Sequence, residues 1–87
     1  MKELRWNLQK SEELEKTRGV SFKEIISEGK IVIVVDHPIR LNQKIILFLF
    51  KRYIWVVPFV EERDYYFLKT MYPSRKLTRI YREGKLK

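Results

Sequence analysis

The sequence contains no cysteine, so disulfide bonds and thiolate metal ligands are excluded. It has one histidine, His37, and only three glycines. It carries no pair of histidines at metal-ligand spacing, no glycine-rich phosphate loop and no nucleophile elbow. No apolar run approaches the ~18 residues of a membrane-spanning helix. Residues 1–10 are polar and of mixed charge, unlike a signal peptide, so we expect a cytoplasmic protein with no membrane segment.

The chain does contain enough apolar material for a folded core. Of its 87 residues, 45% are hydrophobic and 14% are aromatic, although 34% are charged. This length fits a single domain, residues 1–87, with a small core. No internal repeat or low-complexity segment is present.

Positive charge is concentrated at the C-terminal end. The formal net charge is +8, yet residues 1–28 carry six basic and six acidic side chains. Residues 69–87 carry seven basic side chains against one acidic side chain, Glu83; of the seven, Lys85 and Lys87 lie past the predicted last helix and count as tail charge. Such asymmetry predicts a polyanionic partner, either nucleic acid or an acidic protein, although a merely soluble basic surface has the same composition.

The N-terminal third predicts two helices. Residues 3–6 could form a short strand, and Asn7 is then a suitable N-cap for a surface helix over 8–17 that ends at Gly19. A second, shorter helix is predicted over 21–29. Ser21 is its cap candidate, with Glu24 three residues on as a capping box allows, and the helix has an apolar stripe at helical spacing.

The middle of the chain predicts β-strands, because β-branched and aromatic residues dominate it. Four strands are expected, over residues 31–35, 45–50, 53–60 and 65–72. Lys51 and Arg52 fit a hairpin turn, and Pro58 suggests an edge position or a bulge because it cannot donate to a ladder. Ser74 is a suitable N-cap for a final helix that runs to about Glu83.

The predicted order is therefore two N-terminal helices, a four-stranded antiparallel sheet and a C-terminal helix. Because helices must cover one face of the sheet, we expect an α+β two-layer sandwich. The other face would carry tyrosine, phenylalanine and lysine side chains with less cover, and its aromatic rings are candidates for stacking on bases. The aromatic residues considered are Trp6, Phe48, Phe50, Tyr53, Trp55, Phe59, Tyr65, Tyr66, Phe67 and Tyr72.

Basic residues around the last strand and the last helix give the sharpest functional signal. Lys69 lies on the predicted last strand, and Arg75 and Lys76 open the last helix. Arg79 and Arg82 follow Arg75 at i+4 and i+7, so these three arginines share one helix face. A helix N-terminus adds free N–H groups and a positive dipole end. We predict a phosphate-binding corner here, with a solvated helix face as the alternative.

The same residue types permit metal-independent RNA cleavage. In that reaction the 2′-hydroxyl attacks the adjacent phosphorus, and Arg or Lys side chains stabilise charge on the transition-state oxygens. A tyrosine such as Tyr81, or a lysine, can transfer protons, although the spacing does not demand catalysis. His37 is predicted to be structural or solvent-exposed. The acidic residues Glu61, Glu62 and Asp64 fit a solvated turn better than a metal site.

The order of several motifs resembles the BrnT family of type II toxins. Trp6-Asn7 precedes a charged helix, and residues 18–24 read Arg-Gly-Val-Ser-Phe-Lys-Glu. This stretch is similar to a His-Gly-Val-Ser-Phe-like segment of that family, with Arg18 where a histidine is common. Residues 67–81 are similar to the family's closing strand and its Ser-x-Arg-like, threonine-containing helix. The resemblance covers almost the whole chain.

The resemblance implies a RelE-like fold and a ribosome-independent ribonuclease that needs no cofactor or metal. It also implies neutralisation by a ribbon-helix-helix antitoxin, as a toxin–antitoxin heterotetramer or with a toxin homodimer. The catalytic residues would be Lys69, Arg75 and Tyr81. The RNA-binding residues would be Arg18, Lys76, Arg79 and Arg82. Two alternatives stay open: a non-catalytic nucleic-acid binder that uses the same arginines, and an interaction module whose basic face docks an acidic protein.

Overall fold

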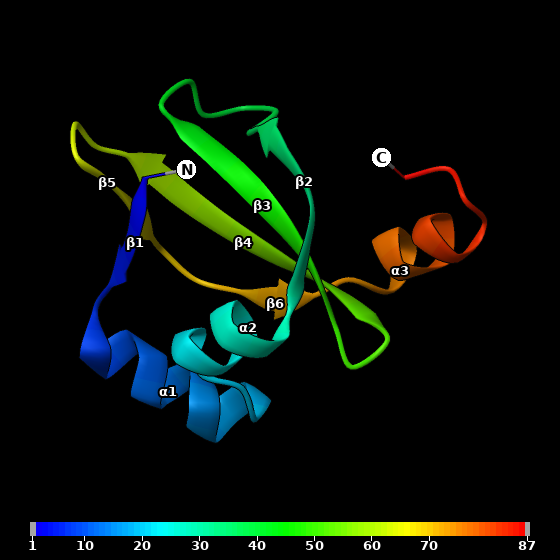
Figure 1. The fold of residues 1–87 in the computed structure, drawn as a ribbon, viewed down its shortest axis with the longest axis horizontal. Helices are drawn as coiled ribbons and strands as arrows, with labels where there is room; N and C mark the ends of the chain where they lie inside the picture. The colour runs from blue at the N-terminus through cyan, green and yellow to red at the C-terminus, as the bar shows by residue number, and fades with distance from the viewer. Residues whose placement is uncertain (1, 87) are drawn as a thin grey trace.

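The structure is a computed structural model that describes residues 2–86, so Lys87, one of the two predicted tail charges, lies outside it. Within that range one strand and two helices precede five consecutive strands and a last helix (Figure 1). The elements are β1 (Glu3–Trp6), α1 (Leu8–Arg18), α2 (Phe22–Glu28), β2 (Lys30–Asp36), β3 (Gln43–Phe50), β4 (Tyr53–Glu61), β5 (Tyr65–Leu68), β6 (Tyr72–Pro73) and α3 (Arg75–Arg82).

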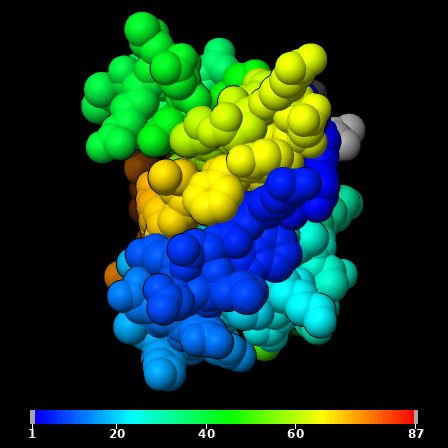
Figure 2. Space-filling view, turned by 90° about the vertical axis from the view of Figure 1, so that its left-hand side faces the viewer, coloured from blue at the N-terminus to red at the C-terminus, as the bar shows by residue number. Residues whose placement is uncertain are grey.

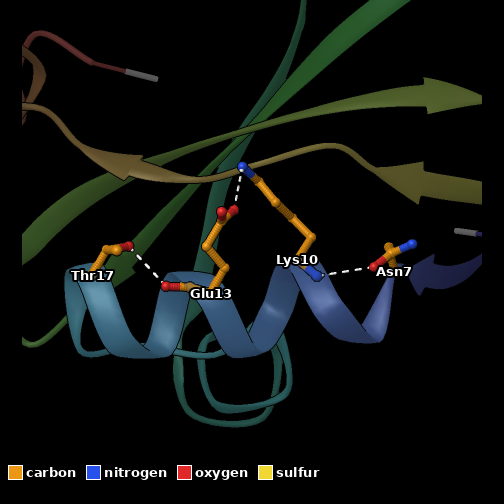
Figure 3. Close-up of polar contacts among 4 residues, drawn as sticks. All are labelled: Asn7, Lys10, Glu13 and Thr17. Atoms are coloured by element: carbon orange, nitrogen blue, oxygen red, sulfur yellow. Dashed lines mark hydrogen bonds and ion pairs between the residues drawn. The ribbon is translucent and has the colours of Figure 1, made fainter.

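Local contacts define the first helix. The Asn7 side chain accepts a hydrogen bond from the Lys10 backbone N–H at 2.9 Å (Figure 3). Gly19 ends α1 with a φ of 77°. Lys10 Nζ lies 3.2 Å from Glu13 Oε1, and the Thr17 hydroxyl donates to the Glu13 carbonyl at 2.9 Å. The cap and the left-handed glycine place α1 where the sequence predicts it.

The sheet is six-stranded and mixed, in the order β1-β5-β4-β3-β2, with β6 paired to β4. β1 and β5 run parallel, and the other pairs are antiparallel. The predicted four-stranded antiparallel sheet is therefore wrong. The short segment at 3–6 joins the sheet as a parallel edge strand, and the predicted strand over 65–72 is divided into two. A parallel pair joins segments that are far apart in the sequence, so no local sequence pattern predicts the pairing of β1 with β5.

Pro58 lies opposite the break between β5 and β6. Residues 59 and 56 of β4 pair with residues 68 and 72, so the partner chain contains one extra residue. The Pro58 carbonyl accepts a hydrogen bond from the Lys69 N–H at 2.9 Å, but proline has no N–H to donate in return. Pro58 itself is buried in an interior strand, and the irregularity that it favours lies on the neighbouring strand.

Helices cover both faces of the sheet, which corrects the predicted two-layer sandwich. On one face α1 and α2 pack on a large core cluster, which consists of Leu14, Val20, Phe22, Ile25, Ile46, Phe48, Phe50, Trp55, Val57, Phe59, Leu68 and Met71. On the other face α3 packs on a smaller cluster of Leu47, Ile54 and Val56. The runs over 45–50 and 54–60 are apolar at consecutive positions, which is typical of strands buried on both faces.

β2 is the edge strand at the opposite side of the sheet from β1. Three of its apolar residues, Ile31, Val34 and Val35, are 37–43% exposed. The pairing with β3 shifts between Ile31 and Ile33, so Val32 is an extra residue in the strand. Such a bulge increases the local twist of an edge strand.

Candidate nucleic-acid interface

α3 has an apolar side and a basic side. Leu77 and Tyr81, one turn apart, are half-buried against the smaller core cluster. Arg75, Arg79 and Arg82 are exposed. Because residues at i, i+4 and i+7 share a helix face, packing of the apolar side on the sheet leaves the three arginines directed away from it.

Hydrogen bonds fix the first turn of α3 to the start of β4. The Ser74 side chain accepts from the Leu77 N–H at 3.1 Å as the N-cap of α3. The Ser74 N–H donates to the Ile54 carbonyl, and the Ile54 N–H donates to the Thr78 hydroxyl, both at 2.9 Å. Thr78 is only 2% exposed. The arginines therefore project from a helix whose position is set by buried polar contacts.

The three arginines line one hollow of about 380 Å³. The other lining residues are Tyr53, Thr78 and Glu83. Arg82 Nη2 donates to the Arg52 carbonyl at 3.1 Å, which joins the last turn of α3 to the turn between β3 and β4. The hollow thus lies where α3 meets this hairpin, and it combines guanidinium groups with an aromatic ring.

The β3–β4 turn has an unusual backbone for its sequence. Lys51 and Arg52 both have positive φ, 52° and 68°, in a two-residue hairpin loop. Asparagine and glycine are the favoured residues in such a loop, because a side chain with a Cβ is strained there. Lys51 Nζ lies 3.8 Å from Glu24 and 5.2 Å from the centre of the Phe50 ring, whereas Arg52 is exposed beside α3.

The arginine charges are not neutralised within the described range. None of Arg75, Arg79 and Arg82 forms an ion pair there, and Glu83, which also lines the hollow, pairs with Lys85 at 3.7 Å. Three like charges along about 10 Å of helix form a row that fits a chain of phosphates better than one carboxylate. The sequence identified this row and counted Tyr53 among the aromatic candidates, but it did not place Tyr53 or the Arg52 turn beside the row. Two basic residues in a turn that favours Asn-Gly were the available signal.

Lys69 lies away from this hollow. Its N–H bonds to Pro58 of β4, whereas Ser74 bonds to Ile54, four residues further back along the same strand. Four residues of strand span about 13 Å. Lys69 Nζ lies 5.5 Å from the centre of the Phe67 ring. The structure therefore does not bring Lys69 and Arg75 to one point.

The other predicted site residues are also dispersed. Tyr81 packs toward the sheet, not among the arginines. Lys76 lines a different, mainly apolar hollow of about 420 Å³ between α3 and β2. Arg18 is in the last turn of α1, which covers the opposite face of the sheet. Of the predicted catalytic and RNA-binding residues, Arg75, Arg79 and Arg82 are the ones that line one hollow.

Glu61, the last residue of β4 and the first of the predicted acidic turn, forms ion pairs with two lysines. Glu61 accepts from Lys2 at 3.0 Å and lies 3.2 Å from Lys44, and hydrogen bonds from these two ammonium groups lower the pKa of its carboxyl. Over residues 2–86 no cluster of three or more His, Asp or Glu side chains suits a metal ion. His37 Nδ1 accepts from the Ile39 N–H at 3.1 Å, so the ring supports its own loop.

Comparison with protein-family models, curated proteins and solved structures gives no significant match. The resemblance to BrnT toxins therefore stays a prediction from motifs. In the part of the chain that the structure describes, no helix has the length and apolar character needed to cross a membrane.

Proposed function

We propose that this chain binds RNA in the cytoplasm through phosphate contacts from α3 and the β3–β4 turn. The observation that carries the proposal is the single hollow lined by Arg75, Arg79 and Arg82. Arginine presents a planar fork of donors that matches phosphate oxygens. Arg52 is exposed and its backbone carbonyl is bonded to Arg82, so we propose its side chain as a fourth cation.

Cleavage of the bound RNA is a further hypothesis, which comes from the resemblance to BrnT toxins. Arg75 is of the right type to stabilise charge on a phosphorane-like transition state. However, the backbone of Lys69 lies about 13 Å along β4 from that of Ser74, and the half-buried Tyr81 packs toward the sheet, so the geometry supports binding better than catalysis. An antitoxin partner and a heterotetramer or homodimer likewise rest on that resemblance alone.

Binding can be tested by fluorescence anisotropy with a labelled RNA at several salt concentrations. Four phosphate contacts on a single strand predict a slope of log K against log salt of about −3. Replacing Arg75 and Arg79 together by Gln should weaken binding about tenfold and reduce the slope by about 1.4. The matched control replaces Lys16 and Lys23 by Gln, because both are exposed on the helices of the opposite face. Equal losses in the two double variants would contradict the proposed surface.

A second experiment separates binding from cleavage. The purified chain is incubated with total RNA in EDTA, and the products are resolved on a denaturing gel. Intact RNA together with salt-sensitive binding supports the binder. Fragments that appear with the parent chain and disappear with Arg75→Ala would establish the ribonuclease instead. No affinity for RNA, together with capture of one acidic protein, would favour the interaction module.

A further inference from the structure

One end of the sheet face that carries α3 is left uncovered by the helix. Along β5, Tyr66 and Leu68 belong to the larger core on the α1–α2 side. Successive strand residues point to opposite faces, so Tyr65 and Phe67 lie on the α3 side. They belong to neither core cluster, and both are only partly buried. In Figure 2 the yellow surface of β5 adjoins the blue surface of β1 on the outside of the molecule.

Two cations cover these rings. Arg5 on β1 pairs with Phe67 across the parallel ladder, and its guanidinium carbon lies 4.3 Å from the centre of the Tyr65 ring. Lys69 Nζ lies 5.5 Å from the centre of the Phe67 ring. The Arg5 side chain is 51% exposed and its Nη2 also pairs with Glu3 Oε1 at 3.2 Å, whereas Lys69 is exposed, so both charged ends are accessible to a ligand. Two aromatic rings and two cations on one open face therefore form a patch, which we call the β5 patch.

The β5 patch and α3 lie on the same face of the sheet, with Tyr72 between them. The extra residue between β5 and β6 keeps Tyr72 opposite Val56, a member of the α3-side core, so Tyr72 is on the same face as Phe67. Tyr72 is 40% exposed. Phe67 pairs with Val60 and Ser74 bonds to Ile54, six residues back along β4, so about 20 Å of strand separates the level of the Phe67 ring from the start of α3. A chain of a few nucleotides can span this distance.

We infer that the β5 patch stacks unpaired bases, and that the ligand of this surface is single-stranded nucleic acid that runs from Tyr65 and Phe67 to the arginines of α3. The inference rests on the proposed function, because α3 supplies the phosphate contacts. Rings spaced two residues apart on a strand, each beside a cation, suit splayed bases and the phosphates between them. In a duplex the bases are stacked on one another, so they cannot stack on these rings.

The test compares a labelled RNA of roughly ten nucleotides, without self-complementarity, with its duplex of the same length. Tyr65→Leu and Phe67→Leu are combined, because leucine keeps an apolar side chain but has no π-face. We expect this double variant to bind the single strand about tenfold more weakly, with unchanged duplex affinity and an unchanged salt slope. The Arg75→Gln and Arg79→Gln variant should instead weaken both RNAs and reduce the slope.

The outcomes separate this inference from the proposed function. Equal affinity of the parent chain for both RNAs, or no selective loss in the leucine variant, overturns the stacking role while the α3 site stands. Absence of binding to either RNA overturns both. Urea denaturation of the leucine variant confirms that it is folded. If it is not, Phe67→Tyr and Arg5→Gln give the answer: the first should keep selectivity for the single strand, and the second should reduce single-strand affinity. The opposite result in either variant contradicts the inference.

Discussion

The hydroxyl oxygen of Thr78 makes two hydrogen bonds, one of which attaches α3 to β4. This hydroxyl accepts from the Ile54 N–H at 2.9 Å and donates to the Ser74 carbonyl at 2.6 Å. Ile54 is completely buried, so its N–H has no access to water. The apolar contacts beneath α3 come from a cluster of three buried residues, much smaller than the core on the other face. The position of the arginines therefore depends strongly on this hydroxyl.

Replacing Thr78 by Val should destabilise the fold by about 1–3 kcal/mol, because the isosteric side chain leaves the Ile54 N–H buried without an acceptor. Urea denaturation measures the change. Thr78→Ser keeps the hydroxyl and loses only a methyl group, so its loss should be clearly smaller. A serine variant as unstable as the valine variant would assign the effect to packing and not to the hydrogen bond.

The ionisation of Glu61 makes the free energy of unfolding depend on pH at acidic values. Hydrogen bonds from Lys2 and Lys44 lower its pKa in the folded chain, so its contribution is present above its ordinary value of 4.5 and is lost as the pH falls below it. Glu61→Gln should be less stable than the parent near pH 7, and this difference should shrink by about pH 3. Urea denaturation at the two pH values measures it. A difference that stays constant with pH would show that the lysine contacts do not act through the charge.

At the scale of elements, the β3–β4 turn holds two basic residues, Lys51 and Arg52, in a backbone conformation with positive φ that strains them. Arg52→Gly relieves a positive φ of 68° and should stabilise the fold by about 1 kcal/mol. The backbone carbonyl that accepts from Arg82 is kept. The lost guanidinium should weaken RNA binding and reduce the salt slope by about 0.7.

Lys51→Asn is the matched control for this turn, because it also relieves a positive φ but removes a charge directed at Glu24. It should stabilise the fold and leave RNA affinity nearly unchanged. Thermal denaturation and anisotropy on the same samples test both variants. Equal losses of affinity in the two variants would show that only the overall charge of the turn matters.

The sequence predicted those elements whose signals are local. The caps at Asn7, Ser21 and Ser74 each accept the expected backbone N–H, because a cap involves only a few neighbouring residues. The β1–β5 pairing could not be predicted, since it depends on where the whole chain folds back. The second helical layer could have been inferred from the unbroken apolar runs of β3 and β4, which leave neither face free for water.

The candidate site likewise has some features that local sequence patterns predict and others that depend on the folded chain. The shared face of Arg75, Arg79 and Arg82 follows from helical spacing, which is a property of the helix alone. The inclusion of Tyr53 in the hollow, and the bond from Arg82 to the Arg52 carbonyl, depend on the contact between α3 and the hairpin. The separation of Lys69 and Tyr81 from Arg75 depends on the pairing along β4 and on the side of α3 that is buried. Neither is visible before the chain is folded.

At the scale of the whole molecule, the charges are separated by the sheet. The helices of the larger core belong to the balanced first 28 residues, whereas α3 belongs to the segment that holds most of the net charge of +8. RNA should therefore approach from the α3 side. Its association rate should fall as salt rises, with a steeper dependence for the parent than for the Arg75→Gln and Arg79→Gln variant. Stopped-flow mixing measures both rates, and equal dependences would rule out steering by α3.

The exposed edge of β2 gives this charge a second consequence, for colloidal behaviour. Its apolar residues Ile31, Val34 and Val35 are available to other molecules, and an unpaired edge is a template for self-association. The repulsion between chains of charge +8 opposes such contacts, but the screening length falls from about 10 Å at 0.1 M salt to about 3 Å at 1 M. Salt high enough to strip bound nucleic acid from the protein therefore also removes the repulsion that keeps one β2 edge from meeting another.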